Sequence, residues 1–157
     1  MAIGIGEILS LTHGSLGILI IVGLPWVMAE ILALHDKAGL KRLKLVILAV
    51  TISAFLSAII FAAPTYITYY PDAKAVINAG ETPWVHGILM EVKEHIGLLA
   101  PMIAFAAAGL IWTSSDRLID DKNQKRLVFV LVIIAFIIAF SVMSMGAYIT
   151  KTAPIGA

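Results

Sequence analysis

The chain has 157 residues, of which 61% are hydrophobic and 13% are charged, whereas an ordinary soluble domain carries about 25% charged residues. This composition excludes a typical water-soluble domain and predicts an integral membrane protein. The formal net charge of +1 leaves no basic surface for nucleic acid, so nucleic-acid binding is excluded. Because the chain has no cysteine, disulfides, thiolate metal sites and the covalent attachment of c-type haem are excluded as well.

Four apolar segments follow one another along the chain, at about residues 7–34, 43–70, 83–113 and 125–150. Each exceeds the roughly 20 residues that a helix needs to cross about 30 Å of hydrocarbon. None shows the two-residue alternation of a barrel strand. The sequence therefore predicts an all-α, integral membrane four-helix bundle that forms a single transmembrane domain over residues 1–157. Polar segments at 35–42, 71–82 and 114–124 are expected to connect the helices.

The basic residues indicate how the bundle is oriented. Eight of the eleven lie around the first and third connections, and three lie on the other side. By the positive-inside rule, both termini are expected outside a prokaryotic plasma membrane. The first apolar segment has no basic residues before it, and its apolar run is longer than that of a signal peptide, so it is expected to remain in the mature protein.

A short repeat relates the two halves of the chain. The motif YIT at residues 66–68 recurs at 148–150, and the same offset of 82 carries His13 onto His95. The motif KRL at 41–43 recurs at 125–127. A duplication would give two tandem helical hairpins related by a pseudo-twofold axis along the membrane normal, whereas chance matches in apolar sequence would give no such symmetry.

Histidines supply the leading candidate site. Counted from the charged ends of their helices, His13 and His95 lie about 34 and 31 Å from the inner boundary, so they occupy nearly one depth. Two imidazoles on separate helices at one depth suit bis-histidine ligation of haem b iron, and histidines within membrane helices usually face the bundle. The metal ligands of this hypothesis are His13 and His95.

Further residues are expected around this predicted haem. Tyr66 and Tyr148 lie in the same layer as the two histidines, and Gly17, one turn from His13, would let a macrocycle approach the backbone. Glu91, four residues before His95, would accept the second imidazole proton. These cofactor-binding candidates are His13, His95, Gly17, Tyr66, Tyr148 and Glu91.

Other interpretations of these residues remain open. Tyrosines at this level are typical of an interfacial belt, and the two histidines would then only hydrogen-bond between helices. A metal or proton site would instead combine His13, His86, Glu91, Glu94 and His95. Because His86 and His95 are nine positions apart, a regular helix places them on opposite faces. His86 and Lys93 are then expected to contact lipid headgroups or a partner subunit.

The chain has four helices with short connections and two histidines at nearly one depth. In this arrangement it resembles the small membrane-anchor cytochrome b subunits of respiratory complexes. The resemblance implies a non-catalytic electron-transfer subunit that binds haem b and passes electrons between a partner redox protein and the quinone pool, with a bound quinone as a further cofactor. Its partners would be the lipid bilayer and other subunits of a redox complex. The alternatives are a structural membrane subunit without cofactor and a proton- or metal-translocating subunit.

Overall fold

The computed structural model describes residues 4–69, 71 and 73–153, and in these residues it contains helices and no strand. Two of the elements are π-helical segments, η1 and η2. In chain order the elements are α1 (Ile5–Leu32), α2 (Lys37–Phe55), η1 (Leu56–Phe61), α3 (Ala62–Tyr69), α4 (Ala73–Ala79), η2 (Val85–Met90), α5 (Glu91–Gly97), α6 (Leu99–Thr113), α7 (Ser115–Asp120) and α8 (Lys122–Thr152).

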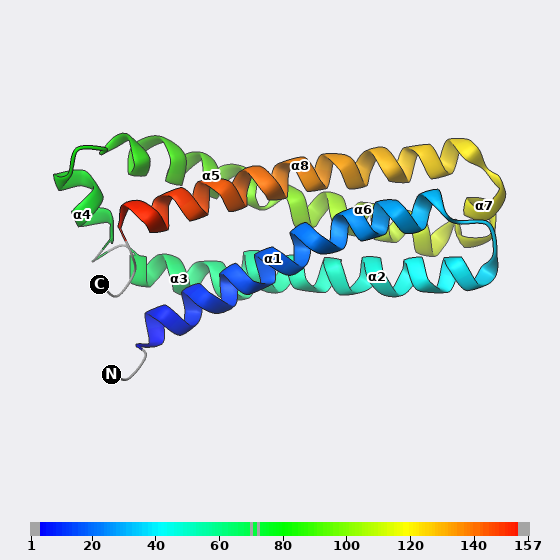
Figure 1. The fold of residues 1–157 in the computed structure, drawn as a ribbon, viewed down its shortest axis with the longest axis horizontal. Coiled ribbons are helices and arrows are strands. Elements are labelled where there is room, and N and C mark those ends of the chain that lie inside the picture. Colours follow the sequence, from blue (N-terminus) through cyan, green and yellow to red (C-terminus); the bar gives the residue numbers. More distant parts are fainter. Residues whose placement is uncertain (1–3, 70, 72, 154–157) are drawn as a thin grey trace.

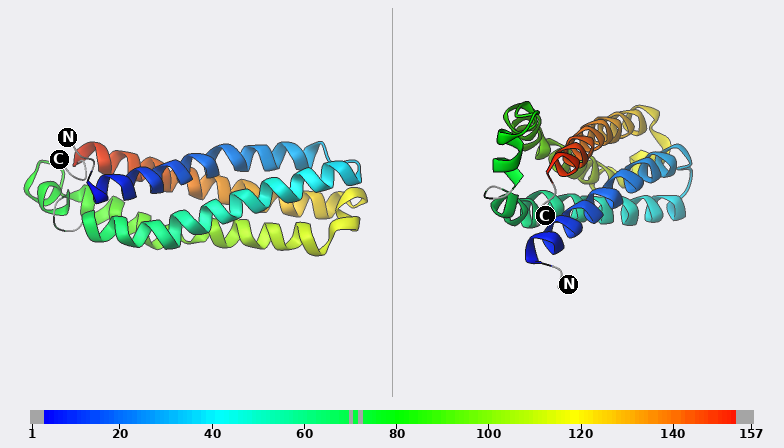
Figure 2. Two further views of the ribbon diagram at one scale, coloured as in Figure 1. Left: turned by 90° about the horizontal axis from the view of Figure 1, so that it is seen from below. Right: turned by 60° about the vertical axis from the view of Figure 1, so that its left-hand side comes forward.

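Four helical spans are long and apolar enough to cross a membrane, as predicted from the sequence. They are Ile5–Leu32, Lys37–Tyr69, Val85–Thr113 and Lys122–Thr152. Figure 1 shows them running along the long axis of the molecule, and Figure 2 shows the same bundle from two other directions. The first and last described residues lie at one end, with α4, and we call this the terminal end. The α1–α2 turn and α7 lie at the opposite, loop end.

The helix boundaries differ from the expected ones mainly at the connections. The second span begins at Lys37 rather than near residue 43, because the Asp36 carboxylate accepts a hydrogen bond of 2.6 Å from the Gly39 backbone N–H and caps the helix. The polar connections at 71–82 and 114–124 are not simple turns, since they contain the short helices α4 and α7.

Polar contacts tie the helices together at the loop end. Lys125 donates a hydrogen bond of 2.7 Å from Nζ to the backbone carbonyl oxygen of Leu34, which would otherwise be unsatisfied just after the end of α1. Glu30 accepts a hydrogen bond from the Trp26 indole N–H at 3.2 Å and forms an ion pair of 3.3 Å with Arg42. The start of α8 and the start of α2 are thereby both attached to the end of α1.

Apolar side chains form two separate cores. The loop-half core buries residues of all four spans, including Leu24, Ile47, Ile111 and Val132. The terminal core is smaller and consists of Tyr69, Ala73, Ile77, Val85, Met90, Ile149 and Ala153, with Tyr66 and Leu89 packed against them.

Between these cores the packing is open. The α5 helix contains no buried residue, α1 has none before Ile20, and α8 has none over residues 136–148. Figure 1 shows α1 crossing the bundle obliquely, and in Figure 2 its terminal half diverges from α5. A layer with little apolar packing therefore separates the two cores.

The two π-helical segments do not correspond under the offset of 82. Residues 56–61 would map onto 138–143, which lie in the uninterrupted helix α8. A π turn forms i→i+5 hydrogen bonds and shifts the helical faces that follow it. The two halves therefore differ in their local helical geometry, and their pseudo-symmetry stays a prediction.

The close approach of α1 and α2 at Gly23 can be tested by substitution. A Cβ atom at Gly23 would collide with the Val50 side chain, so Gly23→Ala is expected to destabilise the protein by about 1–3 kcal/mol. Val50→Ala in the same chain should restore part of this loss. Denaturant unfolding in detergent, followed by far-UV circular dichroism, measures both effects.

The matched control for Gly23 is Gly109→Ala, because a Cβ at Gly109 would meet no atom within 4 Å. It should be neutral or stabilising, by up to about 1 kcal/mol from helix propensity. Equal stability of Gly23→Ala and the wild-type chain would contradict the close contact.

The Asp36 cap predicts a pH-dependent contribution to stability. The hydrogen bond from Gly39 holds the pKa of the Asp36 carboxyl below its ordinary value of 3.8. Asp36→Ala should therefore lower the thermal midpoint at neutral pH. The difference from wild type should shrink below pH 3.8 and vanish below the lowered pKa of the folded protein.

The control for the cap is Asp120→Ala, because Asp120 is exposed at the end of α7 and its carboxylate forms no hydrogen bond within the described part of the chain. Thermal unfolding of each variant across acidic and neutral pH makes the comparison. A difference at Asp36 that did not change with pH would contradict a charged cap.

Candidate functional site

Polar side chains lie between the two cores, in the openly packed part of the bundle. The residues concerned are His13 of α1, Ser57 of η1 and Lys93 of α5, and we call them the polar layer. They come from three of the four membrane-length spans, and Gly146 of α8, in the fourth span, lies beside Lys93. The polar layer is the strongest candidate for a functional site because polar groups inside membrane bundles are costly and are commonly functional.

His13 is fixed by Ser57 across the α1–η1 contact. The Nδ1 atom of His13 lies 3.0 Å from the backbone carbonyl oxygen of Ser57 and 3.1 Å from the Ser57 hydroxyl. With the proton on Nδ1, the imidazole donates to that carbonyl, and the hydroxyl donates to the carbonyl oxygen of His13 at 3.4 Å. The Nε2 atom forms no further hydrogen bond to the described residues, so it is available to a ligand.

The carbonyl that holds His13 belongs to a π-helical segment. Ser57 is buried, with 6% of its surface exposed, and it is the second residue of η1. A π turn interrupts the regular i→i+4 ladder, and such turns occur often at functional sites. The irregular backbone of η1 thus supplies a partner for the histidine of the neighbouring helix.

Lys93 enters the bundle beside α8. A Cβ atom at Gly146 would lie 3.2 Å from the Cε atom of Lys93, so the absence of a side chain at Gly146 gives the lysine its path. Lys93 lies close enough to His13 for their charges to interact, and it also interacts with the charge of the exposed neighbour Glu94. Among the described residues, however, no carboxylate forms an ion pair with Lys93.

His95 lies on a different face of α5 from Lys93. It is exposed, and its Nδ1 atom lies 2.6 Å from the backbone carbonyl oxygen of Glu91. The acceptor is therefore the carbonyl rather than the carboxylate that the sequence suggested. The α5 helix packs on α8, η2 and α6. No described hydrogen bond or ring contact joins His95 to His13. Gly17 is partly buried, and a Cβ there would meet nothing within 4 Å.

The described contacts of the two candidate tyrosines, Tyr66 and Tyr148, are with residues other than those of the polar layer. Tyr66 stacks on Tyr69 with ring centroids 6.1 Å apart and packs against the terminal core. Tyr148 is 44% exposed and lies beside Trp84, with centroids 5.8 Å apart. These contacts place Tyr66 in the packing of the terminal end and Tyr148 on its surface.

The expected orientation of His86 and Lys93 needs correction. His86 is buried, and its Nδ1 atom lies 3.1 Å from the Tyr69 hydroxyl. It therefore faces into the molecule rather than toward headgroups, and Lys93 is half-buried, whereas His95 is exposed. The physical reason is that Tyr69 offers a polar partner and Gly146 offers space, and both lie far away in the sequence.

The alternative metal site is not assembled in the structure. Within the described residues, no three side chains of His, Asp or Glu come close enough together to hold a metal ion. The five residues suggested for such a site differ in exposure: His86 is buried and His13 half-buried, whereas Glu91, Glu94 and His95 are exposed.

Two residues of the polar layer were missed as site residues from the sequence. A serine within an apolar span is a signal for a hydrogen bond between helices, and this signal was present at Ser57. Lys93 was recognised as sharing a face with His86, but the direction of that face was assigned wrongly.

Comparisons with protein-family models, with curated proteins and with solved structures find no match to this chain. The resemblance to cytochrome b anchor subunits therefore stays a prediction from the sequence.

The path of Lys93 over Gly146 predicts slow chemical modification. A water-soluble acetylating reagent should modify Lys93 several-fold more slowly than Lys151, which is exposed in the last turn of α8. Gly146→Leu should fill the path, displace the ammonium group and accelerate modification of Lys93 but not of Lys151. Peptide mass spectrometry over a time course measures both rates, and equal rates at the two lysines in the wild-type protein would contradict this placement.

Proposed function

We propose that this chain is an integral membrane protein that binds the oxygen-bearing head group of a membrane-soluble quinone in its polar layer. The observation that carries the proposal is that the half-buried Lys93 passes over Gly146 of α8 without a described carboxylate in an ion pair, while Ser57 holds His13 through Nδ1. An ammonium group in this environment is costly without a partner. A ligand that accepts hydrogen bonds would supply one.

The donors of the polar layer fit the two carbonyl oxygens of a quinone. Lys93 offers three N–H donors, and the Nε2 atom of His13 can donate or accept according to its protonation. Ser57 orients the imidazole through Nδ1, which leaves Nε2 for the ligand. A bound quinone supplies two-electron redox chemistry, and the positive charge of Lys93 would stabilise negative charge on the oxygen it holds.

The depth of the polar layer suits such a head group. His13 lies 19 residues from Leu32, and Lys93 lies 20 residues from Thr113, at the loop ends of their spans. At 1.5 Å per residue these are about 29 and 30 Å, close to the thickness of the hydrocarbon core. The polar layer therefore belongs at the hydrocarbon boundary, where a quinone ring can remain while its tail extends into lipid.

The apolar packing of the loop half favours a ligand-binding role over a proton- or metal-translocating role. The loop-half core consists of aliphatic side chains, and Thr51 is the buried polar side chain beside it in α2. A proton or metal path would need polar or titratable groups through this half as well. A purely structural role, in turn, gives no account of Lys93 inside the bundle.

The topology inferred from the sequence completes this proposal. With the basic residues of the loop end in the cytoplasm of a prokaryotic cell, the termini and the polar layer face outside. The quinone would then exchange electrons with a partner redox protein at the outer surface. Two duplicated hairpins related by a pseudo-twofold axis remain the proposed origin of the four spans.

Haem b is a second candidate ligand, and one specific observation favours it. Both His13 and His95 place Nδ1 against a backbone carbonyl, which leaves Nε2 for a metal, as in many ligating histidines. His95 is exposed, however, and no described hydrogen bond or ring contact joins it to His13, so haem is the second candidate and quinone the first.

Binding of short-chain quinones tests the proposal. Ubiquinone and menaquinone analogues would be titrated into the detergent-purified protein in a calorimeter. Lys93→Met should weaken binding about tenfold or more, because a hydrogen bond from a charged group is lost, and His13→Phe should weaken it too. The matched control is Lys151→Met, which removes an exposed lysine of the terminal end and should bind like wild type.

The same samples decide between the two candidate ligands. If neither analogue binds the folded wild-type protein, or if Lys93→Met binds as tightly as Lys151→Met, the quinone site is wrong. Reduced-minus-oxidised b-type bands that disappear in both His13→Ala and His95→Ala would support the haem candidate instead.

A further inference from the structure

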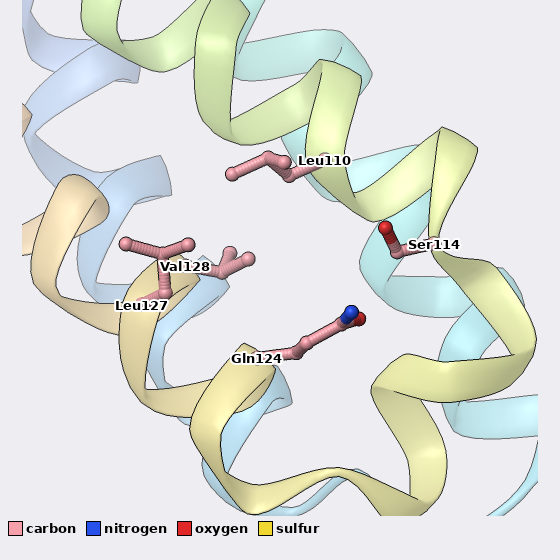
Figure 3. A pocket seen from close by; sticks show the side chains of 5 residues that line it. All are labelled: Leu110, Ser114, Gln124, Leu127 and Val128. Carbon is pink, nitrogen blue, oxygen red and sulfur yellow. The ribbon is translucent and has the colours of Figure 1, made fainter.

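A small cavity lies between α6 and α8 near the loop end, far from the polar layer. Its volume is about 50 Å³, and five side chains line it: Leu110, Ser114, Gln124, Leu127 and Val128. Figure 3 shows the Gln124 amide and the Ser114 hydroxyl pointing into the same space. The cavity thus has an apolar side and a polar side.

The polar side of the cavity lacks hydrogen-bond partners within the described residues. The Oε1 atom of Gln124 is buried and accepts no hydrogen bond there. The Ser114 hydroxyl likewise forms none with the described part of the chain, although the neighbouring Ser115 hydroxyl donates to the Trp112 carbonyl oxygen at 2.8 Å. A buried amide oxygen without a partner is unfavourable, so the Gln124 amide requires one.

We propose that a water molecule occupies this cavity and bridges Gln124 to Ser114. The water donates to the Gln124 Oε1 atom and exchanges a second hydrogen bond with the Ser114 hydroxyl, which gives it the minimum of two polar partners for a buried water. A cavity of this volume holds a water molecule but is far smaller than the pockets of about 300 Å³ or more that bind organic ligands.

The bridge would fix the junction of α6, α7 and α8. Ser114 separates α6 from α7, and Gln124 lies in the first turn of α8, where its backbone N–H donates to the Asp121 carboxylate at 3.2 Å. The Asp121 cap holds the backbone of Gln124 in place, and the water would attach its side chain to the end of α6.

A double-mutant cycle tests the water bridge. Gln124→Met and Ser114→Ala each remove one partner of the water, so each should lower the thermal midpoint, by roughly 2–4 °C. The double variant should lose less than the two single losses combined, because the bridge can be lost only once. The control Asn123→Met changes the exposed neighbouring residue and should leave the midpoint unchanged.

A dry cavity predicts a shift of the thermal midpoint in the opposite direction. If the cavity is dry, Gln124→Met removes an unsatisfied amide and should raise the midpoint, with no coupling to Ser114→Ala. That outcome, or a high-resolution experimental map without density between the two side chains, would overturn the proposal. A folded protein that binds no quinone would leave it untouched, since the two sites share no residue.

Discussion

The hydrogen bonds between His13 and Ser57 are the contact on which the position of α1 in the terminal half of the bundle depends. In the loop half, aliphatic side chains from all four spans hold the helices together. Before Ile20, α1 has no buried residue, so apolar packing contributes little to its position there. The polar contact with the backbone of η1 takes over that role. The position of α1 at the hydrocarbon boundary is thus set by two directional interactions rather than by a core.

The separation of the two cores explains why polar groups can persist between them. An apolar core that continued through the bundle would leave no room for an ammonium group or an imidazole, because interiors are closely packed. Here the loop-half core ends at about the level of Ile20, and the terminal core begins again at Tyr69 and Met90. Gly146 keeps the intervening space open for Lys93. The apolar residues that stabilise the bundle and the residues of the polar layer therefore lie at different levels along it.

The four membrane-length spans could be predicted from the sequence, but the face of each helix that points inward could not. Length and apolar composition determine whether a helix can cross a membrane, and this signal is local. Counting residues also predicts that His13 and His95 lie near one depth. Rotation about the helix axis is different, because it depends on partners such as Tyr69 and Gly146 that are distant in sequence. The short helices α4 and α7 were missed because their residues also suit turns, and the capped start of α2 was obscured by its run of basic residues.

The π-helical segments also limit what periodicity can reveal. Each i→i+5 turn takes up one more residue than an α-helical turn, so the stripes on either side of η1 and η2 are out of phase. A wheel drawn at 100° per residue does not describe the turns within such a segment. Each segment therefore sets which helical face the residues beyond it present. A single-residue deletion in η1 would return that span to regular geometry and rotate the side chains of α3, and with them the surface that this span offers to the membrane.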